Sequence, residues 1–310
     1  MSEAPIRIAV VGLGKIARDQ HLPAILANPD FELVAAIDPF AEEAGCVPLF
    51  RDFDALAASG IEASATAVCT PPKYRAGLAS EALQRGLHVM LEKPPAATVA
   101  EAEELVRLAE KHGRSLFAAW HSREAYAVDA APRWLEGRDI KSVAITWRED
   151  VRVWHPGQNW IFEEGGFGVF DPAINALSIA SAILPGSLTV TGAQLDIPAN
   201  CAAPIAGKVA IEGEDGLPVS LDMDFLQTGE QTWDIAVQTD SGAMLLSLGG
   251  SRLSTPDGEV AGEDAEYPAL YARFAELVRE GRSDVDLTPL ALVERALAIG
   301  ERREVEPFVE

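Results

Sequence analysis

Cysteine and basic residues are both scarce in this chain of 310 residues. The three cysteines, Cys46, Cys69 and Cys201, are widely spaced and form no CxxC pair, which argues against a disulfide framework or a zinc site and favours a reducing compartment. Lys and Arg number 25 against 48 Asp and Glu, so the formal net charge is −23. A chain this acidic repels phosphate backbones and anionic lipid surfaces, and we expect neither nucleic acid nor membrane as a partner.

Several functional signatures are also missing. No apolar run is long enough to span a membrane, and the first residues lack the basic and apolar segments of a secretory signal, so we expect a cytoplasmic protein. The five histidines include no i, i+4 pair at ligand spacing, and we expect no metal site. Neither a GxSxG elbow nor a GxxxxGK[ST] loop is present, which argues against hydrolases and kinases.

The pattern of apolar residues changes near Trp120. Before it, continuous apolar runs alternate with helical stretches, which predicts a parallel sheet covered on both faces. After it, runs between 188 and 248 follow one another without long helices, and several alternate apolar with polar residues, as in an antiparallel sheet with one covered face. Two helical segments are expected at the end, 267–279 and 289–303.

A glycine-rich turn joins the first predicted strand to the first predicted helix. Gly12-x-Gly14-x-x-Ala17 lies there, and Asp38 closes the second strand 24 residues after Gly14. Gly12 permits the tight turn, Gly14 lets the backbone approach a pyrophosphate, Ala17 allows close packing, and Asp38 can accept hydrogen bonds from ribose hydroxyls. The first domain is therefore expected to be an NAD(P)-binding Rossmann domain over residues 1–120. The second, 121–310, is expected to be an α+β substrate-binding and oligomerisation domain on a large, mainly antiparallel open sheet, with a C-terminal helix able to pack back on the first.

The residue that ends the second strand also bears on cofactor choice. A carboxylate at Asp38 repels a 2′-phosphate and Pro39 offers no guanidinium, so NAD is preferred, while Arg51 leaves NADP open. In open α/β sheets the carboxyl ends of the strands face the ligand crevice. The expected cofactor contacts are Gly12, Gly14, Lys15, Ile16, Asp38, Thr70, Pro71, Pro72, Glu92 and Lys93.

Lys93 follows a predicted parallel strand at that same edge. A partly desolvated lysine there can hold or transfer a proton. The alternative is a surface charge pair of Glu92 and Lys93 before the Pro94-Pro95 stop.

Aromatic residues are concentrated between Trp147 and Phe170. Six of them fall within 24 residues, interleaved with polar side chains that include Glu149 and His155. Flat aromatic faces beside polar groups suit a polyhydroxylated ligand, whereas the alternative is packing against the sheet or another subunit. His121 and His155 are candidates to touch substrate, while His21 and His112 are expected on helix surfaces.

Asp171 and Asn175 stand four residues apart on a predicted helix, which places both on one face. The alternative reading is structural, because Asp171 followed by Pro172 also suits an N-cap and first helical position.

Together these motifs resemble the glucose–fructose oxidoreductase / inositol dehydrogenase family. They are the GxGxxA turn, Glu92-Lys93-Pro94 after the fifth strand, and Asp171 with Asn175 in the second domain. Within that family, six segments in order resemble the branch of bacterial D-galactose and L-arabinose 1-dehydrogenases: 14–21, 92–95, 120–123, 149–152, 154–158 and 170–177.

The resemblance implies oxidation of an aldose at the anomeric carbon to an aldonolactone, with reduction of nicotinamide. It places Lys93, Asp171 and Asn175 around the anomeric hydroxyl as the catalytic set. It assigns Glu149 and His155 to the other hydroxyls, with His121 and Trp154 nearby. Many members carry His where this chain has Asn175, and Asn cannot take a proton, so proton acceptance shifts to Lys93 or Asp171.

Two other functions compete with an aldose 1-dehydrogenase. One is a polyol or inositol dehydrogenase, against which the missing histidine at position 175 argues. The other is a regulator that binds a sugar or NAD without turnover, which the intact set of Lys93, Asp171 and Asn175 disfavours. The resemblance further implies a homodimer or larger assembly through the second-domain sheet.

Overall fold

The computed structural model describes residues 4–263 and 265–309. The chain divides into two compact units. Unit 1 holds the described residues of Met1–Trp120 together with Tyr267–Leu287, and unit 2 holds those of His121–Glu266 and Thr288–Glu310. The chain therefore passes from unit 1 into unit 2 after Trp120, returns for Tyr267–Leu287, and ends in unit 2.

Unit 1 is built on a six-stranded parallel sheet of order β3-β2-β1-β4-β5-β6. Each strand is short and almost wholly apolar, because helices cover both faces. The strand order reverses between β1 and β4, the arrangement of a Rossmann domain, which confirms the predicted fold. The strands are β1 (Ile6–Val11), β2 (Phe31–Ile37), β3 (Leu49–Phe50), β4 (Ala65–Val68), β5 (His88–Glu92) and β6 (Leu116–Ala119).

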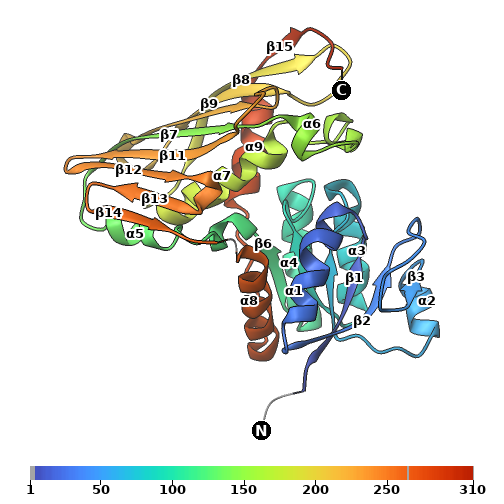
Figure 1. Cartoon of the computed structure of the whole chain (residues 1–310). Helices are drawn as coiled ribbons and strands as arrows, with labels where there is room; N and C mark the ends of the chain where they lie inside the picture. The colour runs from blue at the N-terminus through green and yellow to red at the C-terminus, as the bar shows by residue number, and fades with distance from the viewer. Residues whose placement is uncertain (1–3, 264, 310) are drawn as a thin grey trace. The chain divides into compact units, whose positions relative to one another are not determined.

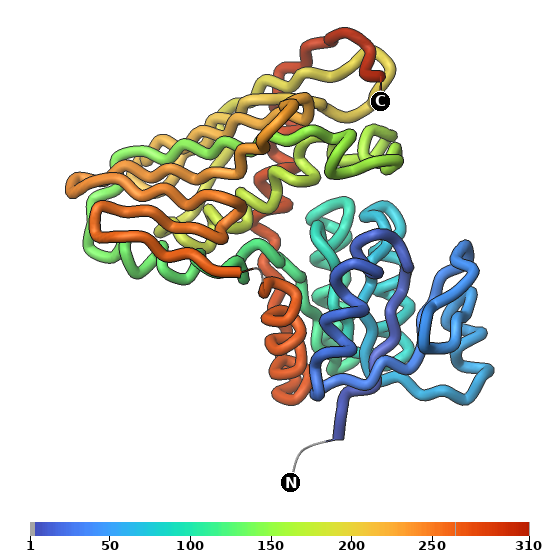
Figure 2. The backbone as a smooth tube through the Cα atoms, viewed as in Figure 1, coloured from blue at the N-terminus to red at the C-terminus, as the bar shows by residue number. Residues whose placement is uncertain are grey.

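Alternate residues of the strands supply two separate cores in unit 1. Ile8 and Val10 pack in one cluster with residues of α1 (Leu22–Ala27) and α8 (Glu266–Glu280). Ala9 and Val11 pack in the other, which includes residues of α2 (Phe53–Ala58), α3 (Pro72–Gln84) and α4 (Val99–His112). Figure 2 shows the orange-red tube of α8 running beside the blue N-terminal segments of the same unit.

Local signals at helix ends match the expected boundaries. Thr98 caps α4, with its side-chain oxygen accepting a 3.2 Å hydrogen bond from the Glu101 N–H, and Gly113 ends the helix at φ 60°. The helix after the glycine-rich turn is less regular, because a π-helical segment, η1 (Ala17–His21), precedes α1.

Unit 2 carries a nine-stranded mixed sheet of order β14-β13-β12-β11-β7-β10-β9-β8-β15 (Figure 1). Only the pairs β7–β10 and β8–β15 are parallel among these strands, so the sheet is mainly antiparallel, as predicted. The strands are β7 (Ile140–Arg148), β8 (Thr189–Pro198), β9 (Ala206–Glu212), β10 (Pro218–Asp224), β11 (Thr232–Thr239), β12 (Gly242–Ser247), β13 (Arg252–Thr255), β14 (Gly258–Ala261) and β15 (Glu301–Val305).

The longest helix of unit 2 is α7, whose residues are almost all buried. The helices of this unit are α5 (Ala130–Leu135), α6 (Val151–Trp154), α7 (Phe170–Ile183) and α9 (Thr288–Ile299), with single turns η2 (His121–Glu124), η3 (Asn159–Phe162), η4 (Glu214–Gly216) and η5 (Leu248–Gly250). None of the helices within residues 4–263 and 265–309 is long and apolar enough to cross a bilayer.

The expected helix over 289–303 is wrong at its end. Helix α9 stops at Ile299, and residues after Gly300 form β15, which pairs in parallel with β8. Beside this backbone pairing, the guanidinium of Arg303 donates to both carboxylate oxygens of Asp196 at 2.7 and 2.6 Å. Glycine is a poor helix former, so Gly300 interrupts the helix, and Arg303 then gains a carboxylate partner on β8.

Candidate active site

The glycine-rich turn of unit 1 is shaped by a close approach to β4. Gly12 has φ +87°, and a Cβ atom there would lie 2.8 Å from Cγ2 of Thr70, so only glycine fits. At Gly14 nothing lies within 4 Å of where a Cβ would stand. The turn is therefore pinned at Gly12 and open at Gly14, as a pyrophosphate-binding loop requires.

Asp38 holds this turn in addition to its expected role toward a ribose. Its Oδ2 accepts a 2.8 Å hydrogen bond from the Leu13 N–H, and its Oδ1 accepts from the N–H groups of Phe40 and Ala41 at 2.8 and 3.0 Å. Each carboxylate oxygen has further acceptor capacity, and Asp38 is only half-buried. The sequence motif indicated the ribose role and missed the structural one.

A dinucleotide fits the residues found at this edge of unit 1. Oγ1 of Thr70 is buried and has no hydrogen-bond partner within the described part of the chain. Lys15 and Ile16 are exposed, and Lys15 forms an ion pair with Asp19 on its own helical turn. The Thr70 hydroxyl is therefore available to donate a hydrogen bond to a bound dinucleotide, and Gly14 leaves room for its pyrophosphate to approach the backbone.

Glu92, at the end of β5, is the centre of a buried polar cluster. It is 3% exposed, and its Oε1 accepts from the Tyr267 hydroxyl at 2.6 Å and contacts Nε2 of His21 at 3.0 Å. Its Oε2 accepts from the N–H of Lys93 at 2.8 Å. Tyr271 completes the cluster, with its hydroxyl 2.7 Å from Nδ1 of His21.

His21 was expected on a helix surface, and that expectation is wrong, because its side chain is 0% exposed. Its partners Tyr267 and Tyr271 come from α8, and Tyr271 lies 250 positions further along the chain, so no local pattern reveals them. Burial by itself lowers the pKa of His21, but its neighbours Cys69, Tyr271 and Glu92 raise this pKa well above the ordinary value. Burial raises the pKa of Tyr271.

Arg75 is a second residue that the sequence did not single out. It is buried on α3, and its Nη1 donates to the carbonyl of Glu92 at 2.7 Å and to the carbonyl of Pro94. Its Nη2 donates to the carbonyl of Thr70. One guanidinium therefore joins the loops after β4 and β5, which carry expected cofactor contacts. Lys93, which lies between the carbonyls of Glu92 and Pro94, is half-buried.

In unit 2, Glu149 is buried, 3% exposed, with a donor at each oxygen. Nε2 of His155 lies 2.9 Å from Oε1, and Nε1 of Trp233 donates to Oε2 at 2.8 Å. Nδ1 of His155 is 4.0 Å from Oδ2 of Asp171. The structure thus brings together Glu149, His155 and Asp171, and adds Trp233, which only the pairing of β11 with β7 places there.

The aromatic stretch divides between core and surface. Trp147, Phe167 and Phe170 are buried in unit 2, as the packing alternative predicted. Trp154 is 41% exposed, and its ring stands edge-on to Trp233 with the centroids 4.8 Å apart. Trp154 is therefore the aromatic residue of this stretch that is both exposed and in contact with the Glu149 cluster.

Helix α7 presents Asp171 and Asn175 one turn apart. The helix begins at Phe170 with Val169 as N-cap, so the alternative of Asp171 as N-cap is wrong: it is the second residue of the helix. Asp171 is buried, and Asn175 is half-buried with an amide oxygen, Oδ1, that has no hydrogen-bond partner among the described residues. A buried acceptor without a donor is costly, and a ligand hydroxyl would satisfy it.

His121 is held by a different carboxylate. His121 is the first residue of η2, and its Nδ1 lies 2.5 Å from Oε2 of Glu266. Within the part of the chain that the structure describes, no three His, Cys, Asp or Glu side chains form a group able to hold a metal ion.

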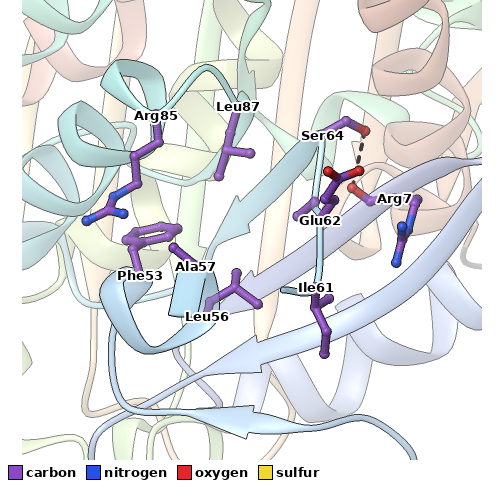
Figure 3. Close-up of a pocket in the computed structure, with 10 residues that line it drawn as sticks. Arg7, Phe53, Leu56, Ala57, Ile61, Glu62, Ser64, Arg85 and Leu87 are labelled. Carbon is purple, nitrogen blue, oxygen red and sulfur yellow. Dashed lines mark hydrogen bonds between the residues drawn. The ribbon is translucent and has the colours of Figure 1, made fainter. Parts of the chain in front are cut away.

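One cavity of unit 1 lies at the edge opposite the glycine-rich turn. Figure 3 shows its walls at the amino ends of the strands, with Arg7 and Ser64 on one side and the guanidinium of Arg85 beside the ring of Phe53 on the other. Its volume is about 570 Å³. Because ligands of open α/β sheets bind at the carboxyl ends of the strands, this cavity is separate from the candidate cofactor site.

Comparison with known proteins identifies the family of this chain. Residues 6–119 match the model of an oxidoreductase family with an NAD-binding Rossmann fold. A galactose 1-dehydrogenase of Pseudomonas fluorescens is 41% identical over 320 residues, covering 99% of both chains.

Two solved structures share the fold of this chain. A D-galactose-1-dehydrogenase protein from Rhizobium etli superposes with a TM-score of 0.95 at 48% identity, covering 100% of this chain and 99% of that one. A 3-ketoreductase from Actinomadura kijaniata, solved with NADP and TDP-benzene, shares the fold with a TM-score of 0.84 at 19% identity over 97% and 99% of the two chains. The full-length match therefore shows that the chain belongs to the glucose–fructose oxidoreductase / inositol dehydrogenase family of oxidoreductases with an NAD-binding Rossmann fold.

Proposed function

We propose that this protein is an NAD(P)-dependent aldose 1-dehydrogenase, which oxidises the anomeric carbon of a sugar such as D-galactose or L-arabinose to the aldonolactone. The observation that carries the proposal is the polar set of unit 2, where a buried Glu149 is held by His155 and Trp233 and the amide oxygen of Asn175 has no partner among the described residues. Fixed acceptors beside an exposed indole suit a sugar. The two relatives that are named galactose dehydrogenases also support an aldose as the substrate.

In this proposal the protein's side chains divide binding from proton handling. Lys93 anchors the anomeric hydroxyl and assists its deprotonation, and Asp171 serves as proton acceptor or as electrostatic partner. Asn175 accepts a hydrogen bond from the sugar and holds no proton. Glu149 and His155 bind the remaining hydroxyls, with Trp154 and His121 nearby. The nicotinamide, when bound, supplies the hydride acceptor.

NAD is the preferred cofactor in this proposal. The Asp38 carboxylate is held in place by three backbone N–H groups, and its charge repels a 2′-phosphate. Arg51 lies beside it, with Nη1 3.5 Å from the Pro39 carbonyl, and this guanidinium keeps use of NADP open.

The test is the initial rate of NAD and NADP reduction, measured separately with D-galactose, L-arabinose, D-fucose, D-xylose, D-glucose and myo-inositol. We expect turnover of an aldose, fastest with NAD, and loss of turnover in Lys93→Met with NAD binding retained. Turnover of myo-inositol alone would point to a polyol dehydrogenase. Binding of NAD without turnover of any sugar would point to a regulator.

The same proposal includes a homodimer or larger assembly through the sheet of unit 2. Alternation along β7 buries Val143 and Ile145 and leaves Ala144 exposed, and Leu245 on β12 is exposed as well. The same face carries the ion pair of Arg148 with Asp222, and an open sheet face that mixes apolar and charged side chains suits a subunit contact. Light scattering at micromolar concentration should give at least twice the mass of one chain, and a monomeric mass would contradict the assembly.

A further inference from the structure

We infer that Glu92 is a positioning residue for Lys93, and that Tyr267 of α8 and His21 act through it. The inference rests on the proposed function, because it takes Lys93 as the residue that anchors the anomeric hydroxyl. It adds that the end of β5 is held by side chains from η1, α3 and α8, and not by the strand alone.

The Glu92 carboxylate connects α8 to the backbone of Lys93. One oxygen, Oε1, receives the Tyr267 hydroxyl at 2.6 Å and lies 3.0 Å from Nε2 of His21. The other, Oε2, receives the N–H of Lys93 at 2.8 Å. The donors at the first oxygen set the plane of the carboxylate, and this plane sets where the N–H of Lys93 can lie.

The carbonyls on either side of Lys93 are held by Arg75. Its guanidinium donates to the carbonyl of Glu92 at 2.7 Å and to the carbonyl of Pro94. The peptide group that precedes Lys93 is therefore fixed at its carbonyl by Arg75 and at its N–H by Glu92. A side chain that leaves from a backbone held in this way starts from one position, which is what preorganisation of a reactive amine requires.

Burial argues that this cluster has a role beyond stability. Glu92 is 3% exposed and His21 is 0% exposed, so each polar group has given up its water. Apolar side chains of similar volume often fill such positions at equal or greater stability. Apolar packing does not orient a neighbouring group. The two carboxylate oxygens of Glu92 do, because one accepts from Tyr267 and the other from the N–H of Lys93.

The test is a double-mutant cycle on Glu92 and Tyr267 in the full chain. Tyr267→Phe removes one hydroxyl and leaves the ring, so we expect kcat to fall about 10-fold while the KM for the sugar and the affinity for NAD change less than about twofold. Glu92→Gln should lower kcat at least as far. Because Tyr267 acts through Glu92, adding Tyr267→Phe to Glu92→Gln should cause no further loss.

Ser115→Ala is the matched control. Oγ of Ser115 is buried and donates at 2.9 Å to the Leu277 carbonyl of the same helix α8, away from Glu92. It should lower the melting temperature and leave kcat unchanged. At His21, Gln keeps an N–H donor where Leu has none, so His21→Gln should retain more of kcat than His21→Leu.

The inference would be overturned by additive losses in the cycle, or by a loss of kcat in Ser115→Ala equal to that in Tyr267→Phe. Unchanged kcat in Tyr267→Phe would also overturn it, provided that Lys93→Met abolishes turnover. Full turnover in Lys93→Met would instead overturn the role of Lys93 on which this inference rests, whereas no turnover of any sugar by the parent protein would overturn the proposed function, so the failures are distinguishable.

Discussion

Glu149 and His155 stand six residues apart in the chain, and a 2.9 Å contact joins Oε1 of the carboxylate to Nε2 of the imidazole. Glu149 follows β7 directly, and His155 follows α6 directly, so the short helix between them brings the two side chains together. The second carboxylate oxygen is occupied by Nε1 of Trp233 from β11. The imidazole is therefore oriented by a carboxylate that the sheet itself holds.

Replacing Glu149 should weaken sugar binding. Glu149→Gln keeps the shape but sets an amide N–H₂ against one of the two donors, so one buried hydrogen bond is lost. We expect the KM for the aldose to rise about 10-fold and the free energy of unfolding to fall by about 1–3 kcal/mol. Steady-state kinetics and urea unfolding measure both.

Trp233→Phe is the companion variant, because it keeps an aromatic ring and removes only the N–H donor to Oε2. It should change the KM in the same direction by a smaller factor. An unchanged KM in both variants would contradict the role of this carboxylate in sugar binding.

Asn175→Leu should separate activity from stability. The amide oxygen of Asn175 is buried and without a partner among the described residues, so an isosteric apolar side chain removes a desolvation cost. We expect stability to hold or to rise by about 1 kcal/mol, while kcat/KM falls about 100-fold because the sugar loses its acceptor.

The control on the same helix is Ser178→Ala. Oγ of Ser178 donates to the Asn175 carbonyl at 2.7 Å, so this bond is satisfied and its loss should lower the melting temperature. Parallel thermal melts and rate measurements compare the two variants. A melting temperature lowered in Asn175→Leu as in Ser178→Ala would show that the amide is structural.

Asp38→Asn should shift cofactor choice toward NADP. The substitution removes the charge that repels a 2′-phosphate while one amide oxygen still accepts from the N–H groups of Phe40 and Ala41. We expect the ratio of kcat/KM for NADP to that for NAD to rise about 10-fold or more.

Asp52→Asn is the control, since Asp52 caps α2 by accepting from the Ala55 N–H at 2.7 Å. It removes a charge from the same unit and should leave the cofactor ratio unchanged. Equal shifts in the two variants would mean that net charge, and not the position of Asp38, decides the preference.

His88 should make the stability of the protein depend on pH. Its Nδ1 accepts a 3.0 Å hydrogen bond from the Ser115 N–H, and burial together with the nearby Arg114 lowers its pKa from 6.5 to about 4. Because the folded pKa is the lower one, the unfolded chain binds more protons between these values. This contribution to stability is therefore complete above pH 6.5 and is lost as pH falls toward 4.

Urea unfolding from pH 4.5 to 7.5 checks this dependence. His88→Asn keeps an acceptor near Nδ1 without a titratable group, so its midpoint should fall less on acidification than that of the parent. Arg114→Met removes one of the two causes that lower the pKa of His88, so it should reduce the pH dependence of the urea midpoint by less than His88→Asn does. Identical pH curves for the parent and His88→Asn would refute the assignment.

Features that depend on neighbours within a few residues could be predicted from the sequence. The turn at Gly12 and Gly14, the position of Asp38, and the ends of α4 at Thr98 and Gly113 are of this kind. The alternation of apolar residues likewise predicted the parallel sheet of unit 1 and the mainly antiparallel sheet of unit 2. These patterns are readable because the backbone geometry that they require is local.

Other features arise only when distant segments pack. Tyr267 reaches Glu92 across 175 positions and Trp233 reaches Glu149 across 84, through contacts that depend on which helix covers which face and which strands pair. The burial of His21, the hydrogen bonds of Arg75 to backbone carbonyls and the strand after Gly300 also depend on how distant segments pack. Periodicity shows that a side chain is buried or exposed, but the partner of a buried polar group is decided by the tertiary structure, because its hydrogen bond must be made wherever the packing brings a donor and an acceptor together.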